Sequence, residues 1–199
     1  MKSDTERVAR ACAAALALLG LHALHASAAA EAAIRNWPRR SRAVASFMIK
    51  KYDEPNSSDA NSLVWYNNGQ WRKTVVYRRP PRNVAGSRGD DILEQTISYD
   101  VPDDKIAALR SFDDRIKFDK GKGELSSRSE NENYNYLALN LADEIVRGKR
   151  SPDEALDDYR RTIRLSESGK NSELLYGFSF PLTVEPRGFP DSSGNGRAP

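Results

Sequence analysis

Cysteine and histidine are the scarcest chemically versatile residues of this 199-residue chain, which has one cysteine and two histidines. All three lie near the N-terminus, within a segment that has the order typical of a secretory signal peptide. A positively charged start is followed by an apolar run from Ala11 to Leu24 and by an A-x-A cleavage site ending at Ala28. The apolar run is shorter than the ~20 residues that a membrane-spanning helix needs, which favours cleavage over an uncleaved anchor. We therefore predict that residues 1–28 are a signal peptide, that the protein is exported to the periplasm or secreted, and that it keeps no stable membrane span.

Cleavage would remove Cys12, His22 and His25, so that no cysteine or histidine remains from Ala29 onward. The mature protein could then form no disulfide, and it could hold neither a Ser-His-Asp nor a Cys-His nucleophile. Metal sites and haem sites that depend on imidazole or thiolate ligands would also be excluded. We expect no catalytic residue from these classes, no metal and no cofactor. Carboxylate, lysine and tyrosine side chains remain as the available acid–base groups.

The chain also lacks a large excess of charge of either sign. The chain has 31 basic and 28 acidic residues, and the leader takes Lys2, Arg7 and Arg10 with two of the acids, which leaves 28 against 26. A balance this close to neutral gives no electrostatic reason to expect nucleic acid as a partner.

The clearest local pattern is a β-hairpin. Two runs rich in β-branched and aromatic residues, 62–66 and 70–77, flank Asn67-Asn68-Gly69, and an Asn-Gly pair readily takes the positive φ angles of a tight turn. A helix from about Pro38 to Tyr52 precedes the hairpin, with Val44, Phe47, Met48 and Lys51 on one face. We expect a mobile loop from Arg82 to Asp91 after the hairpin.

The alternation typical of strands and the spacing typical of helices predict further elements. A third strand over 92–101 alternates apolar and polar residues, a short helix begins near Pro102, and a second hairpin pairs 115–119 with 124–128. Two helices come next; Gly148 ends the first, and Ser151-Pro152-Asp153-Glu154 forms a capping box for the second. Residues 174–184 are expected to form a last strand or an extended segment. We predict an α+β fold with an antiparallel sheet of about five strands, in which the helices and strands follow the order α-β-β-β-α-β-β-α-α. The fold is expected to be a single domain over 37–184, followed by a disordered tail over 185–199.

Two resemblances accompany these patterns. The helix, Tyr52-x-x-Pro55 and the following Trp-containing hairpin resemble exported bacterial modules of the outer-membrane-assembly lipoprotein and β-lactamase-inhibitor-like type, in which glycine is usual where this chain has Asp53. The run from Leu63 to Tyr77, together with Leu137-Ala138-Leu139-Asn140-Leu141-Ala142, is similar to an uncharacterised family of exported bacterial proteins. These resemblances imply export and the fold, and they supply no catalytic residue.

The candidate ligand-binding set lies in and just after the second strand of the first hairpin. Alternation places Arg72 and Arg78 on one face and Lys73 and Arg79 on the other, with Trp71 and Tyr77 nearby. Such a set could bind an anionic glycan, a lipid or a peptide. The alternative is a solvated strand face whose cations discourage edge pairing, with the aromatic rings packed as cross-strand core pairs.

The remaining candidates are acidic. Glu94 is expected on the solvent face of its strand, and Asp103 and Asp104 are explained by helix capping, although a pair of carboxylates in a cleft would suit a glycosidase-like site. Lys120-Gly121-Lys122-Gly123 is interpreted as a turn. We therefore expect an exported, non-enzymatic protein that binds a protein or another component of the cell envelope. The alternative is a carboxylate-dependent hydrolase that acts on envelope polysaccharide.

Overall fold

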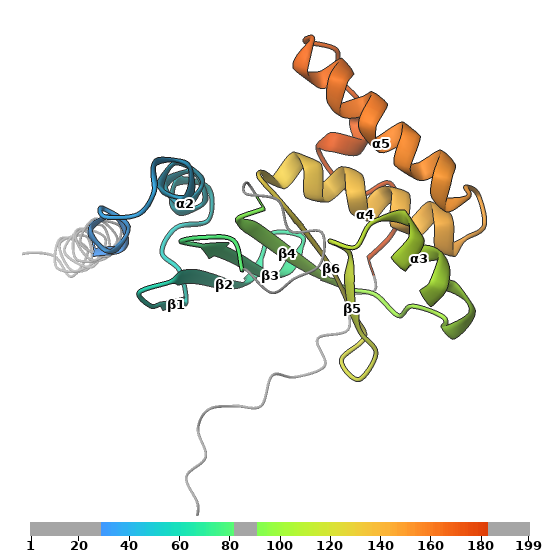
Figure 1. The fold of residues 1–199 in the computed structure, drawn as a ribbon. Helices are drawn as coiled ribbons and strands as arrows, with labels where there is room; N and C mark the ends of the chain where they lie inside the picture. Colours follow the sequence, from blue (N-terminus) through green and yellow to red (C-terminus); the bar gives the residue numbers. More distant parts are fainter. Residues whose placement is uncertain (1–28, 82–90, 183–199) are drawn as a thin grey trace, which may run out of the picture. The chain divides into compact units, whose positions relative to one another are not determined.

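The computed structural model describes residues 29–81 and 91–182, so the predicted signal peptide, almost all of the predicted loop at 82–91 and the predicted tail lie outside the described residues. The α+β class is confirmed, with 43% of the described residues helical and 21% in strands (Figure 1). The sheet is antiparallel and has six strands rather than about five, in the order β1-β2-β3-β4-β6-β5. The elements are α2 (Arg39–Tyr52), β1 (Ser57–Ser58), β2 (Ser62–Asn68), β3 (Trp71–Tyr77), β4 (Leu93–Ser98), η1 (Asp103–Lys105), α3 (Ile106–Phe112), β5 (Lys117–Asp119), β6 (Glu124–Ser129), α4 (Glu132–Val146), α5 (Pro152–Glu167) and η2 (Glu173–Leu175).

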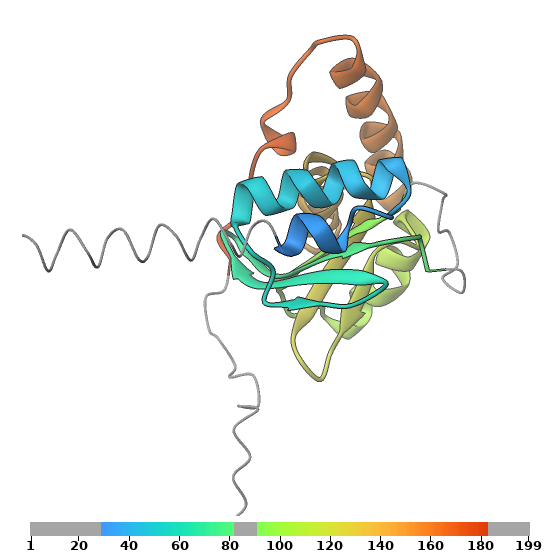
Figure 2. The same cartoon turned by 90° about the vertical axis from the view of Figure 1, so that its left-hand side faces the viewer.

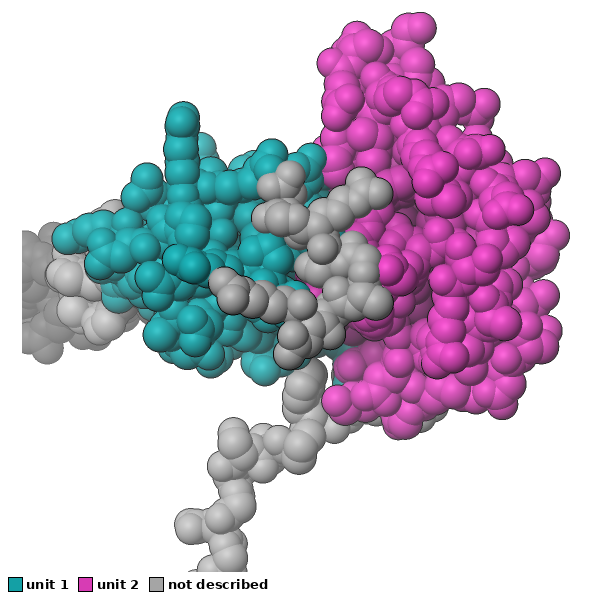
Figure 3. All heavy atoms as spheres, in the orientation of Figure 1, with its two compact units in different colours: residues 1–94, 129–131 teal, residues 95–128, 132–199 magenta. Residues whose placement is uncertain are grey.

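The chain divides into two compact units, which Figure 3 colours separately. Unit 1 holds residues 1–94 with 129–131, and unit 2 holds 95–128 with 132–199. The additional strand belongs to unit 1. There Ser57 and Ser58 pair with Val64 and Leu63, in a segment that the sequence patterns assigned to a loop.

In unit 1, α2 begins one residue later than predicted because Pro38 occupies the N-cap position with extended backbone angles. The helix buries Ser41, Ala45, Met48 and Ile49 and packs across the β2–β3 hairpin (Figure 2). The predicted apolar face was therefore wrong for Phe47, which is 58% exposed. Small side chains at positions 41 and 45 let the helix approach the strands closely. Because the face with these two residues is buried, Phe47 points outward.

The first hairpin is confirmed, with a register running from Ser62↔Tyr77 to Asn68↔Trp71. The turn lies one residue later than expected, since Asn68 is the last residue of β2 and the two connecting residues are Gly69 and Gln70. Positive φ angles occur at Asn67 and Gly69. The hairpin and α2 enclose a core cluster in which Trp65 and Leu63 are almost completely buried.

Unit 2 contains the second predicted hairpin, with Lys117–Asp119 paired to Ser126–Glu124. The Lys-Gly-Lys-Gly segment forms the turn between these strands, as predicted. The alternation of β4 is also confirmed at Leu93, Gln95 and Ile97, which are buried.

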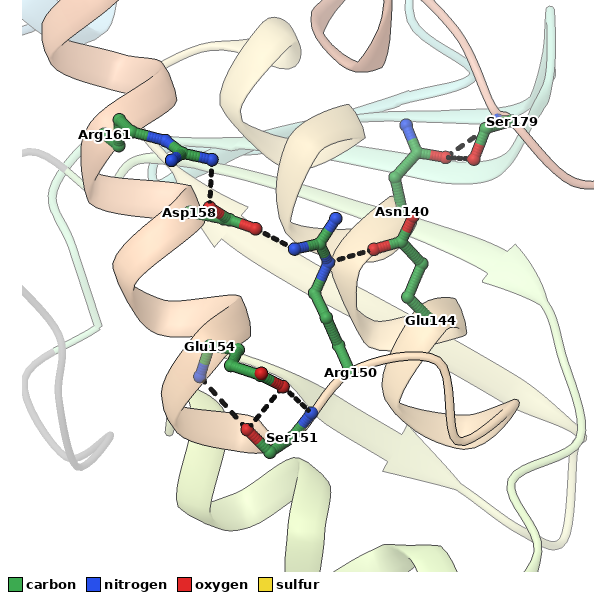
Figure 4. A network of polar contacts seen from close by, with 8 residues as sticks. All are labelled: Asn140, Glu144, Arg150, Ser151, Glu154, Asp158, Arg161 and Ser179. Carbon is green, nitrogen blue, oxygen red and sulfur yellow. Dashed lines mark hydrogen bonds and ion pairs between the residues drawn. The ribbon is translucent and has the colours of Figure 1, made fainter.

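Helices α4 and α5 of unit 2 pack against each other, and α4 also contacts α3 and η2. The capping box of α5 is confirmed. The Ser151 hydroxyl accepts a bond from the Glu154 N–H, while the Glu154 carboxylate accepts one from the Ser151 N–H (Figure 4). The bond from the Ser151 N–H is the main cause that holds the pKa of Glu154 below its ordinary value, and a bond from the Ser151 hydroxyl is the second.

Of the two alternatives predicted for 174–184, a last strand or an extended segment, the strand is wrong for the described part, which forms η2 and then irregular backbone to residue 182. The reason is Asn140, a fully buried side chain of α4. Its Nδ2 donates to the carbonyl oxygens of Leu174 and Gly177 at 3.0 and 2.8 Å. Its Oδ1 accepts from the Ser179 N–H at 2.8 Å and from the Ser179 hydroxyl (Figure 4). Backbone groups that a strand would need are thus bonded to one side chain.

Candidate functional site

A depression in unit 1 gathers half of the predicted ligand-binding set. It has a volume of about 510 Å³ and is lined by Asn61, Tyr77, Arg78, Arg79 and Pro81. The predicted residues Tyr77, Arg78 and Arg79 are therefore brought together where β3 ends. Asn61 and Pro81 were not predicted.

The other three predicted residues are not among those lining the depression. Arg72 and Lys73 lie beside the hairpin turn, about 20 Å along β3 from Arg78 and Arg79 at the usual rise per residue. Trp71 is 1% exposed, and its ring belongs to the protein interior. The core interpretation of this tryptophan therefore holds, and it offers no exposed ring for a sugar to stack on.

The backbone around the depression is fixed by bonds from three directions. The Arg78 N–H donates to the Asn61 carbonyl at 2.7 Å, which extends the β2–β3 pairing by one residue. The Tyr77 N–H donates to the Ile92 carbonyl at 2.8 Å. From α2, the Ser41 hydroxyl donates to the Arg78 carbonyl at 2.8 Å. The two arginines therefore project from a backbone that is held on both sides.

Asn61 is positioned by a tight turn before β2. The carboxylate of Asp59 accepts hydrogen bonds from the backbone N–H groups of Asn61 and Ser62, each at 2.7 Å, and from the Ser62 hydroxyl. The bond from the Asn61 N–H is the main cause that lowers the pKa of Asp59, because it stabilises the charged form. An ionised Asp59 thus keeps Asn61 at the wall of the depression.

Arg78 has an unused hydrogen-bond donor. Its Nε is buried and has no hydrogen-bond partner among the residues that the structure describes, while its Nη2 reaches the Asn36 carbonyl only at 3.5 Å. A buried donor without a partner costs about 1–3 kcal/mol. Arg79 is exposed beside it.

Among the described residues, the lining contains two arginines, an asparagine and a tyrosine, and no acidic residue. Two acids contact residues of the lining: the Asp59 carboxylate accepts from the Asn61 N–H at 2.7 Å, and the Glu94 Oε2 lies 3.4 Å from the Tyr77 hydroxyl. A guanidinium binds carboxylate or phosphate oxygens with two parallel hydrogen bonds. The chemistry of the depression therefore suits an anionic group, with hydroxyl or amide groups of the ligand bonding to Asn61 and Tyr77.

The acids that could serve a hydrolase have other partners. In unit 2 the buried carboxylate of Asp113 pairs with Arg115, that of Asp143 with Tyr99 and Arg147, and that of Glu132 with the Gln95 amide. Asp103 is exposed and pairs with Lys120. Glycoside hydrolysis requires two carboxyl groups about 5–10 Å apart across a cleft. None of the acids named here is among the described residues that line the depression.

Within the part of the chain that the structure describes, no three His, Cys, Asp or Glu side chains are grouped as metal ligands would be. No helix among residues 29–81 and 91–182 is long and apolar enough to cross a membrane.

Comparison of the chain with protein-family models, with curated proteins and with solved structures found no match in any of the three. The resemblance to exported bacterial proteins therefore remains a prediction from the sequence, and the depression is interpreted from its own chemistry alone.

Proposed function

We propose that this protein is an exported binding protein, without catalytic activity, that holds an anionic component of the cell envelope in the depression beside β3. The observation that carries the proposal is the pair of arginines, Arg78 and Arg79, that line the depression together. Export rests on the signal-peptide pattern of residues 1–28.

The size of the depression supports a ligand of a few functional groups, since small-molecule sites commonly enclose about 300–1,000 Å³. Two guanidinium groups at one wall favour a carboxylate or phosphate, and the polar groups of Asn61 and Tyr77 favour hydroxyls beside it. An acidic polysaccharide or a phosphorylated envelope glycan combines these features.

The test is binding of polygalacturonate, a carboxylate-bearing polysaccharide, to the full chain, measured by isothermal titration calorimetry with uncharged dextran as the reference. We expect binding to polygalacturonate alone. Arg79→Gln should weaken it about tenfold, the effect of losing one charge-assisted hydrogen bond of about 1.5 kcal/mol. Arg78→Lys keeps the charge but removes the paired donors, and we expect a similar loss.

Arg164→Gln is the matched control, because Arg164 is an exposed arginine of α5 in unit 2. Equal weakening by Arg164→Gln and Arg79→Gln would show that the polysaccharide responds only to overall charge, and the depression would then not be its site. Unaltered affinity in both Arg79→Gln and Arg78→Lys would contradict the proposal in the same way.

A further inference from the structure

The outer face of α2 carries charge of one sign around an exposed aromatic ring. The helix RRSRAVASFMIKKY has five basic residues and no acidic residue. Its buried side faces the hairpin, and the opposite side exposes Arg39, Ala43, Phe47 and Lys50. At 3.6 residues per turn these four share one stripe of the helix. Phe47 is 58% exposed in the middle of that stripe.

Neighbouring segments of unit 1 reduce this charge only in part. Arg40 pairs with Glu130 at 3.3 Å, and Glu31 accepts a bond from the Ser46 hydroxyl at the flank of the helix. Asp53 and Glu54 follow the last turn. The helix and the segment before it carry six basic residues in total, against these four acids: Arg35, Arg39, Arg40, Arg42, Lys50 and Lys51.

Arg78 adds to the cationic side near the start of the helix. Its guanidinium lies beside the Asn36 carbonyl, in the segment that leads into α2. The backbone bond from Ser41 holds this arginine and the helix together. The positive region thus extends from the exposed stripe toward residues that precede the helix.

We propose that this face of α2 docks on an anionic lipid bilayer, with the ring of Phe47 entering the boundary between headgroups and acyl chains. A basic amphipathic helix with an aromatic residue binds membranes in this way. The surrounding lysines and arginines would extend their charged ends toward lipid phosphates.

The shape of the surface favours lipid over a folded partner. Phe47 stands on the convex outer side of a helix, whereas a protein hot spot is usually an aromatic ring in a well-packed pocket. A deformable bilayer accepts a convex surface without a matching cavity. The inference goes beyond the proposed function, because it assigns a different ligand to side chains that, apart from Arg78, do not line the depression.

The first experiment measures sedimentation of the full chain with vesicles of equal parts phosphatidylglycerol and phosphatidylcholine, and with vesicles of phosphatidylcholine alone. We expect tighter binding to the anionic vesicles, weakened by salt. Phe47→Ala should weaken it about tenfold, and each of Arg39→Gln and Lys50→Gln about fivefold. Tyr176→Ala is the control in unit 2, because Tyr176 is also 58% exposed.

The second experiment shows which residue enters the lipid. The natural tryptophans Trp37, Trp65 and Trp71 are at most 5% exposed, so a tryptophan at position 47 would be selectively accessible. Lipids brominated in their acyl chains should quench the fluorescence of Phe47→Trp on anionic vesicles, and should leave that of Tyr176→Trp unchanged. The leader is present in every variant, so differences between variants report on α2.

Equal quenching of Phe47→Trp and Tyr176→Trp would overturn the proposal. So would quenching of Phe47→Trp on vesicles of phosphatidylcholine alone, if adding Arg39→Gln or Lys50→Gln left that quenching unaltered. Arg79→Gln separates the two proposals. It should weaken binding of polygalacturonate about tenfold while reducing vesicle binding by much less than Phe47→Ala does.

Discussion

Asp53 occupies a backbone conformation that normally requires glycine. Its φ of 60° and ψ of −154° place it in a region that side chains with a Cβ rarely adopt. The position ends α2, and two neighbours explain why the conformation is kept. Pro55 prevents the helix from continuing, and the Asp53 carbonyl accepts a hydrogen bond of 3.0 Å from the buried indole nitrogen of Trp65.

We predict that Asp53→Gly stabilises unit 1. A residue other than glycine in this region costs about 1–3 kcal/mol. Glycine removes that strain but adds about 0.5–1 kcal/mol of conformational entropy to the unfolded chain. The net gain should be about 1 kcal/mol. With a urea dependence of about 2 kcal/mol per molar, the unfolding midpoint should rise by ~0.5 M.

The assay is urea unfolding followed by tryptophan fluorescence, because Trp65 is buried beside the substituted residue. Asp53→Ala is the matched control, since it removes the carboxylate and keeps the Cβ. We expect its free energy of unfolding to stay within about 0.5 kcal/mol of that of the natural protein. Equal stabilisation by Gly and Ala would assign the effect to the lost charge and would refute the argument from backbone strain.

Three further substitutions test unit 2. Tyr99→Phe should cost about 1 kcal/mol at neutral pH, because it removes the 2.9 Å bond to Asp143. Burial first, and then the Asp143 bond, raise the pKa of Tyr99, so the natural protein should lose stability as pH rises above ~10, while the unfolded chain releases its proton first. Tyr99→Phe should flatten this alkaline loss in urea titrations at several pH values. Asn140→Ala should cost about 3 kcal/mol or more, because four hydrogen bonds hold the segment after η2, and hydrogen exchange should show loss of protection there. Gly123→Ala should cost about 1–2 kcal/mol in thermal melts owing to its φ of 61° and to the Asp100 Oδ1, 2.7 Å from the added Cβ. Gly121→Ala, where the added Cβ would meet only the Asp119 Oδ1 at 3.4 Å, should cost less than ~1 kcal/mol.

Local signals predicted most of the elements. The hairpin of unit 1 follows from alternation and from an Asn-Gly pair, both of which depend on residues close in sequence. Its turn was displaced by one residue because Asn68 pairs with Trp71 as the last residue of β2. The Asn68 amide donates to the Thr74 hydroxyl at 2.9 Å, where both side chains are buried.

Tertiary contacts decided what the local signals left open. Two faces of α2 carry apolar residues, and helical spacing alone does not say which of them meets the sheet. The small residues Ser41 and Ala45 identify the buried face, and their importance appears only when a sheet lies against them. The failed strand after residue 174 has a similar origin, because its backbone partner is the side chain of Asn140, more than thirty residues earlier.

The candidate site could have been predicted more fully from the same hairpin. Once Ser62 pairs with Tyr77, the next residues outward, Asn61 and Arg78, must lie opposite each other, and the bond between them confirms this. The Asp59-x-Asn61 sequence is typical of a turn in which a carboxylate bonds to the following N–H groups. What the sequence could not provide is the burial of the Arg78 Nε, which depends on the approach of the segment before α2.

The two proposed surfaces of unit 1 have one residue in common, and that fact determines how their tests are to be interpreted. Arg78 lines the depression, yet its Nη2 and its carbonyl both contact the region of α2. A change at Arg78 can therefore disturb both surfaces through the backbone. Phe47 and Arg79 each belong to one surface, so only a pair of variants at these two positions can separate lipid docking from ligand binding. If Phe47→Ala reduced polygalacturonate binding as strongly as Arg79→Gln does, the two surfaces would have to be treated as one extended anionic-ligand site.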